Sequence, residues 1–167
     1  TYEEEIAEVS FARLKESVHR FMNETNFKRF VMIVRSAGFI DSSMLRSQNI
    51  LNFAYIVYLS LRDQNVEATE IETTVRRWLV MSILTRRYSG SAESAFDLDI
   101  RRIDEIGVTK YLADIEKAEL SDALWNSGLP QQLNTSVVSS PFFNLYLAAQ
   151  VKMNDKGFLS KDITVSD

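Results

Sequence analysis

Apolar residues recur at helical spacing along most of the chain. In the first segment they lie four, three, four and three residues apart: Ala7, Phe11, Leu14, Val18 and Phe21. This spacing predicts an apolar stripe on one face of a helix over residues 2–24. Thr1 and Glu4 stand at the two positions of a capping box and predict the start of that helix.

The segment 27–37 does not show a clear period. Phe30 to Val34 form a continuous apolar run, rich in β-branched and aromatic residues, which fits either a buried strand or a buried helix. Asn26 before the segment and Gly38 after it are residue types that favour helix boundaries. We therefore expect a helix here, with a strand as the alternative.

Two longer helices are predicted in the middle of the chain. Over residues 47–63, apolar side chains surround nearly the whole circumference, which indicates a helix at the centre of a bundle. Asn49 and Asn52 within it would then need hydrogen-bond partners. Over residues 69–87, an acidic first turn precedes a broad apolar face, and the acidic residues suit the helix dipole.

The predicted helices become shorter in the second half of the chain. Ser91 is the expected N-cap of a helix that ends at Gly107. Ser140 followed by Pro141 gives a strong start signal for another helix. The remaining predicted segments are helices over 110–118, 122–126 and 141–154 and a loop over 126–130.

These segments predict one all-α domain, an irregular bundle of about seven helices, some of them short, over residues 1–155. The length of 167 residues suits a single domain with a sizeable core. Only 5 Gly and 2 Pro leave few turns for a strand-rich fold. Residues 156–167 alternate weakly in polarity, and we expect an extended tail that leads to a further, C-terminal domain.

Composition and charge exclude several function classes. A net charge of −4 disfavours a general nucleic-acid coat, since such proteins are usually basic. The sequence has no Cys and only one histidine, His19, which excludes thiolate and multi-histidine metal sites. It has no phosphate loop or other cofactor motif, so no cofactor is expected. The longest apolar run, within 50–61, is too short to span a membrane, and a cytoplasmic location is expected.

The break between two predicted helices is the candidate site. Its residues are Arg86, Arg87, Tyr88, Ser89, Gly90 and Ser91. A helix N-terminus presents free N–H groups that can bind a phosphate or a carboxylate. Gly90 would let an anion approach the backbone, and the arginines and serines would complete a cradle. The simpler interpretation is a capped corner with solvated arginines, which is the commoner structure.

Further charged residues lie on both sides of this corner. Arg76 and Arg87 are three helical turns apart and would share a face, which Arg101 and Arg102 could extend into a basic strip. The alternative, which we favour, is that the arginines pair with nearby acids. Those acids are Glu72, Asp97, Asp99 and Asp104. We expect the aspartates and Glu105 to be surface acids rather than a divalent-cation site.

Two segments of the chain resemble a known protein family. They are Ser47-Gln48-Asn49, before the central apolar helix, and the stretch from Arg77-Trp78 through Arg87-Tyr88-Ser89-Gly90-Ser91 to Glu93. Both are similar to the helical middle region of bacterial proteins related to the GmrSD modification-dependent restriction enzymes. The resemblance extends over residues 40–167.

In that family, a ParB-like domain with a DGQQR motif precedes the helical region, and an HNH-type nuclease domain follows it. This sequence contains neither the DGQQR motif nor the HNH histidines, so the family's catalytic residues have no counterpart here. The resemblance implies a non-catalytic middle domain that couples a nucleotide-sensing domain to a nuclease domain in a DNA-targeting defence protein. Its expected partners are the flanking domains of the parent chain, DNA through the parent, and a second copy.

A second function class is open. The chain could be a helical protein–protein interaction or oligomerisation module unrelated to nucleic acid. Its ten Phe, six Tyr and two Trp suit that function equally well. Salt dependence distinguishes the two classes, because phosphate contacts make binding fall steeply with salt concentration.

Overall fold

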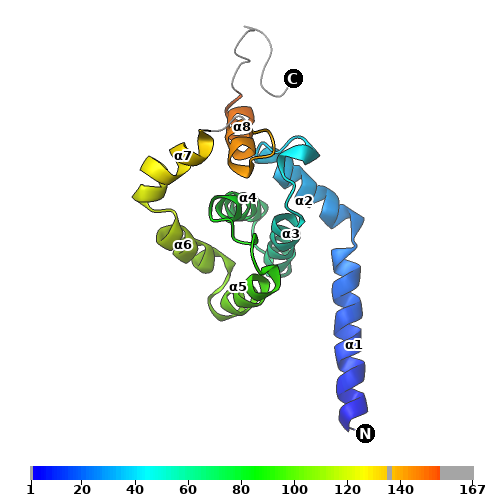
Figure 1. Ribbon diagram of the computed structural model, residues 1–167. Helices are drawn as coiled ribbons and strands as arrows, with labels where there is room; N and C mark the ends of the chain where they lie inside the picture. Colours follow the sequence, from blue (N-terminus) through cyan, green and yellow to red (C-terminus); the bar gives the residue numbers. More distant parts are fainter. Residues whose placement is uncertain (1, 135–136, 155–167) are drawn as a thin grey trace.

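The computed structural model describes residues 2–134 and 137–154, and this part is all-α, without a strand (Figure 1). Its α-helices are α1 (Tyr2–Phe21), α2 (Glu24–Ser36), α3 (Gln48–Asp63), α4 (Ala68–Leu84), α5 (Ala92–Ile106), α6 (Val108–Glu119), α7 (Leu129–Leu133) and α8 (Pro141–Met153). A 3-10 turn, η1 (Ser42–Met44), and a π-helical turn, η2 (Leu124–Gly128), are also present. The predicted all-α class is confirmed. Among the described helices, none has the length and apolar content needed to cross a bilayer.

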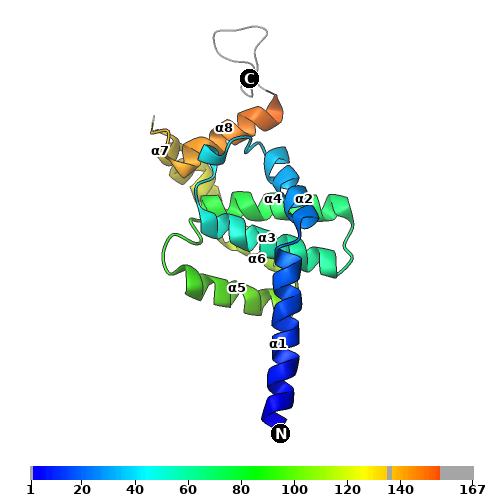
Figure 2. The same ribbon diagram turned by 90° about the vertical axis from the view of Figure 1, so that its right-hand side faces the viewer.

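α3 and α4 lie side by side at the centre of the body (Figures 1 and 2). The rings of Phe53 and Trp78 stack between them, with centroids 5.4 Å apart, and both side chains are fully buried. α2, α6 and α8 pack against α4, and α5 packs against α6. The central position predicted for segment 47–63 is thus confirmed. Asn52 nevertheless lies on the exposed side of α3, so water can satisfy the amide that was expected to need a partner.

α1 projects away from the body, and its C-terminal end packs on α3 (Figures 1 and 2). Phe21 meets Tyr55 edge-on, with ring centroids 5.0 Å apart, and the Tyr55 hydroxyl donates to the Phe21 carbonyl (3.0 Å). Farther from the body, Phe11 and Leu14 are 67% and 62% exposed. Ahead of Phe21, the predicted apolar stripe is therefore not covered by the part of the chain that the structure describes. Thr1 of the predicted capping box lies outside the described residues.

The helix predicted over 2–24 ends early, because Asn23 starts α2. The Asn23 side chain accepts a hydrogen bond from the N–H of Asn26 (3.0 Å), as an N-cap residue does. Asn26, the predicted boundary, therefore lies inside α2. The ambiguous segment 27–37 is helical rather than extended, and Phe30 on it is buried.

The predicted start of α8 at Ser140 is confirmed, and of the two serines that could start α3, Ser43 and Ser47, it is Ser47 that caps the helix. The hydroxyls of Ser47 and Ser140 accept hydrogen bonds from the N–H groups of Ile50 and Phe143, both at 3.4 Å. Each serine thereby satisfies a backbone donor that has no partner within its helix. Asn154, in the left-handed conformation with φ 56°, ends α8 as predicted.

The stretch before α8 differs from its prediction. Residues 126–130 are helical, in η2 and α7, where the sequence predicts a loop. Pro130 lies in the first turn of α7, where its missing N–H costs no helical hydrogen bond. α6 begins at Val108, directly after Gly107, rather than at residue 110. The extended tail expected over 156–167 lies outside the described residues.

Gly38, which follows α2, holds a conformation that alanine cannot adopt without strain. Its φ is +97°, and an added Cβ would lie 2.0 Å from the backbone oxygen of Ala148 in α8. We predict that Gly38→Ala lowers the free energy of unfolding by about 3 kcal/mol in urea titrations, through strain and backbone clash. Gly90→Ala is the matched control, because a Cβ there meets no atom within 4 Å. Equal stability of the two variants would contradict the packing of α8 on Gly38.

Candidate functional site

The corner after α4 is a left-handed helix end. The helix ends at Leu84 rather than at the predicted residue 87. Arg86 has φ 51°, and its N–H donates to the Ile83 carbonyl (3.2 Å). The N–H of Arg87 donates to the Ser82 carbonyl (3.1 Å). These two bonds form a Schellman motif, in which the left-handed position is usually glycine.

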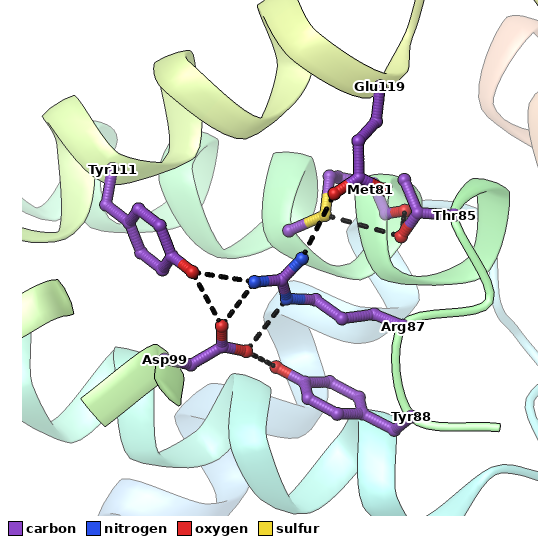
Figure 3. A network of polar contacts seen from close by, with 7 residues as sticks. All are labelled: Met81, Thr85, Arg87, Tyr88, Asp99, Tyr111 and Glu119. Atoms are coloured by element: carbon purple, nitrogen blue, oxygen red, sulfur yellow. Dashed lines mark hydrogen bonds and ion pairs between the residues drawn. The ribbon is translucent and has the colours of Figure 1, made fainter. Parts of the chain in front are cut away.

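Beyond this turn, Arg87 forms an ion pair with Asp99 of α5 (Figure 3). Asp99 is fully buried, and the Arg87 side chain is only 11% exposed. Arg87 Nε donates to Asp99 Oδ2 (2.8 Å), and Arg87 Nη2 donates to Asp99 Oδ1. The hydroxyls of Tyr88 and Tyr111 donate to the same carboxylate, at 2.7 and 2.9 Å. We call Arg87, Tyr88, Asp99 and Tyr111 the Arg87–Asp99 cluster.

The Arg87–Asp99 cluster also reaches α6. Arg87 Nη2 donates to the Tyr111 hydroxyl (2.7 Å), and Arg87 Nη1 lies 3.4 Å from Glu119 Oε1. Tyr111 and Glu119 stand near opposite ends of α6. One guanidinium therefore connects the corner after α4 to α5 and to α6 (Figure 3).

Burial and the Asp99 charge set the protonation of the cluster. Burial lowers the pKa of Arg87, but the hydrogen bond and charge of Asp99 outweigh it, so the pKa lies above its ordinary value. Burial, followed by the Asp99 charge, raises the pKa of Tyr88 well above its ordinary value. Burial and the hydrogen bond to Asp99 raise the pKa of Tyr111 to about 12. Both tyrosines stay neutral at pH 7 and can donate to the carboxylate.

The predicted site residues thus do not come together as one anion-binding cradle. Arg87 and Tyr88 turn inward to Asp99, so Arg87 is not the solvated or anion-binding residue that the sequence suggests. Ser91 occupies the N-cap position of α5, but its hydroxyl lies 3.0 Å from that of Ser94 instead of capping the helix. Gly90 is exposed and without close neighbours, so no tight backbone approach requires it.

Arg86 does not join the Arg87–Asp99 cluster and is instead one of the residues that line a cleft. The cleft has a volume of about 320 Å³ and lies beside the first turns of α3 and α8. Its polar lining includes Arg46, Ser47, Arg86, Ser89 and Ser139. Where the structure describes the lining, it contains no carboxylate. We call this feature the Arg46–Arg86 cleft.

The two cleft arginines are held by neutral groups. Arg86 Nη2 donates to Gln132 Oε1 (2.8 Å), and its guanidinium lies 5.0 Å from the centroid of the Phe142 ring. Arg46 Nε donates to the Ser43 carbonyl (3.2 Å). Over the described ranges, neither guanidinium has a carboxylate partner, so both charges can attract an acidic group.

The predicted basic strip does not form. Arg76 and Arg87 do not share a face, because α4 ends before Arg87 and the chain turns there. The favoured alternative, local pairing with the named acids, is confirmed for Arg76 with Glu72 (2.9 Å), for Arg101 with Asp97 (3.8 Å) and for Arg87 with Asp99. Arg102 pairs instead with Glu105 (2.8 Å). Asp99 is a buried acid rather than a surface one. The described residues contain no cluster of three or more acids or histidines that could hold a metal ion.

The sequence pattern predicts Asp99 to be a surface acid and does not single out Tyr111 or Arg46 as site residues. A signal for Asp99 is available, since it stands three residues after Phe96 and four before Ile103, the spacing of residues on one face of a helix. A carboxylate on that apolar face needs a buried partner. The sequence offers no comparable signal for Arg46, because its place in the cleft depends on how α8 packs beside α3.

Comparison with known proteins does not identify a relative. The chain matches no known family, no curated protein and no solved structure. Its function must therefore be inferred from its own residues.

The buried ion pair leads to a stability prediction. Asp99→Asn should lower the free energy of unfolding by about 3 kcal/mol, because it removes the buried counter-ion of Arg87 and leaves only Glu119, a more distant and half-exposed one. Asp97→Asn is the matched control on the same helix, since Asp97 is 74% exposed and should contribute less than about 1 kcal/mol. Urea unfolding followed by circular dichroism measures both. A loss at position 99 no larger than that at position 97 would refute a structural role for the pair.

Proposed function

We propose that this chain is a non-catalytic helical domain of a cytoplasmic, DNA-targeting restriction or defence protein. In this role it couples a nucleotide-sensing N-terminal domain to a C-terminal nuclease domain. Its own contribution is a contact with an acidic group at the Arg46–Arg86 cleft. The resemblance of two segments to the GmrSD-related proteins supports this role. Those segments lie far apart in the sequence, yet Ser47 from one and Ser89 from the other line the same cleft.

The observation that carries the proposal is the conformation of Arg86. In the described ranges, the other residues with positive φ are Gly38, Asn65, Gly107 and Asn154. Glycine and asparagine tolerate this conformation, whereas arginine there costs free energy, about 1 kcal/mol. A glycine would end α4 at lower cost. We therefore infer that the Arg86 side chain is present for its contacts, which are those with Gln132 and the Phe142 ring and the proposed one with an acidic partner.

The surrounding charges support an acidic partner. The chain has a net charge of −4, so most of its surface does not attract phosphates. At the cleft, two arginines lie without carboxylate partners and beside serine hydroxyls. The first turns of α3 and α8 add the positive ends of two helix dipoles. The backbone phosphates of DNA are the first partner to test, because the resemblance implies a DNA-targeting parent.

The alternative class, an interaction module unrelated to nucleic acid, is favoured by a different observation. Phe11, Leu14 and Val18 of α1 are exposed, and they lie on one stripe. Such a stripe fits a protein partner better than a phosphate backbone. Both functions would coexist if the stripe binds protein while the cleft binds an anion.

Titration with labelled duplex DNA tests the proposed function. Binding should weaken with salt, and the combined Arg46→Ala and Arg86→Ala change should lower affinity about ten-fold or more. Each lost phosphate contact should reduce the slope of log affinity against log salt by about 0.9. Arg101→Ala is the control, because Arg101 is an exposed arginine already paired with Asp97. Binding that does not depend on salt, or that responds equally to all three arginines, would favour the alternative class.

A further inference from the structure

The uncovered stripe of α1 needs a partner. α1 has 20 residues and one apolar face, and most of the stability of a helix in a protein comes from packing such a face. Val18 is 45% exposed, and Phe11 and Leu14 are more exposed still. Figures 1 and 2 both show the helix extending beyond the rest of the body. The stripe around Phe11, Leu14 and Val18 is therefore accessible to another molecule.

The stripe has the repeat of a two-stranded coiled coil. Its members alternate at spacings of four and three residues, which is the a and d pattern of the heptad repeat. Phe11 and Val18 take a positions, and Ala7 and Leu14 take d positions. Glu8 and Lys15 then stand at successive e positions, beside the seam, and both are exposed. Ser10 and Ser17 occupy the g positions on its other side.

The charged and apolar positions of α1 match those of a second α1 helix when the two helices run in opposite directions. In an antiparallel pair centred between Phe11 and Leu14, Phe11 packs on Leu14 of the second copy, and Ala7 packs on Val18. Glu8 then faces Lys15 of the second copy, and two-fold symmetry produces this ion pair twice. In a parallel pair in register, Lys15 faces Ser10 instead, and that pairing is lost. We propose that α1 binds α1 of a second copy of this chain in antiparallel orientation.

The size of the side chains supports this occupant. Ser10 and Ser17 are small, so the two helices can approach closely on the side away from the charges. Phe11 and Leu14 form the middle layers and bring the largest apolar surfaces to the centre of the contact. The body of each copy lies at the opposite end of the paired helices, because each α1 leaves its body at Phe21.

Sedimentation velocity across a concentration series is the first test. The wild-type chain should show a monomer–dimer equilibrium, and Phe11→Asp should raise the dissociation constant at least about ten-fold. Val9→Asp is the matched control, because Val9 is 50% exposed on the same helix but takes the f position, away from the seam. Circular dichroism confirms that each variant is folded. A monomer at every concentration, or a dimer indifferent to Phe11→Asp, would overturn the proposal.

Charge exchange tests the choice of partner. Glu8→Lys alone and Lys15→Glu alone should each weaken self-association about ten-fold, since each places like charges opposite one another twice. A mixture of the two variants should associate as well as the wild type, because both pairs are then of opposite charge. Failure of the mixture to recover would show that the helices do not face each other.

Cross-linking tests the direction. The chain contains no Cys, so single introduced thiols react without background. A mixture of the Ser10→Cys and Ser17→Cys proteins, treated with a short bismaleimide, should give mostly the mixed dimer. Preferential Ser10→Cys homodimer cross-links would indicate a parallel pair and refute the antiparallel one.

Discussion

The body of this protein depends on the buried ion pair between Arg87 and Asp99. A carboxylate with no solvent exposure is costly unless its charge is paired and its lone pairs are filled. Here two arginine N–H groups and two tyrosine hydroxyls fill them. Because the donors come from the corner after α4 and from α6, the acid on α5 can be satisfied only when all three parts are in place. The pair therefore specifies the arrangement as much as it stabilises it.

The left-handed turn at Arg86 gives two adjacent arginines opposite roles. Arg87 is buried in the ion pair with Asp99, whereas Arg86 lines the cleft together with Arg46. Two neighbouring arginines that look like one basic segment in the sequence thus have different roles, since Arg87 is structural and Arg86 can meet a partner. α1 also has one structural part and one free part, since Phe21 packs on the body while Phe11, Leu14 and Val18, which precede it in the helix, stay exposed.

Local signals in the sequence predict the helices well. The apolar circumference of 47–63 identifies the central helix. Ser140 followed by Pro141 identifies the start of α8, because a cap is a local hydrogen bond. The end of α4 was not predictable in this way, since a non-glycine residue adopts the left-handed turn. Which acid in the cluster after Ser91 is buried also depends on tertiary packing. The stripe of α1 predicts a covered face, but it cannot say whether the cover lies in the same chain.

The coupling energy between Arg87 and Asp99 tests the central claim most directly. A double-mutant cycle with Arg87→Ala, Asp99→Ala and the combined variant, measured by urea unfolding, isolates that energy from the loss of each side chain's other contacts. We predict a coupling of about 2–3 kcal/mol, with the double variant much less destabilised than the sum of the two single variants. Additive losses, with a coupling below about 0.5 kcal/mol, would contradict it.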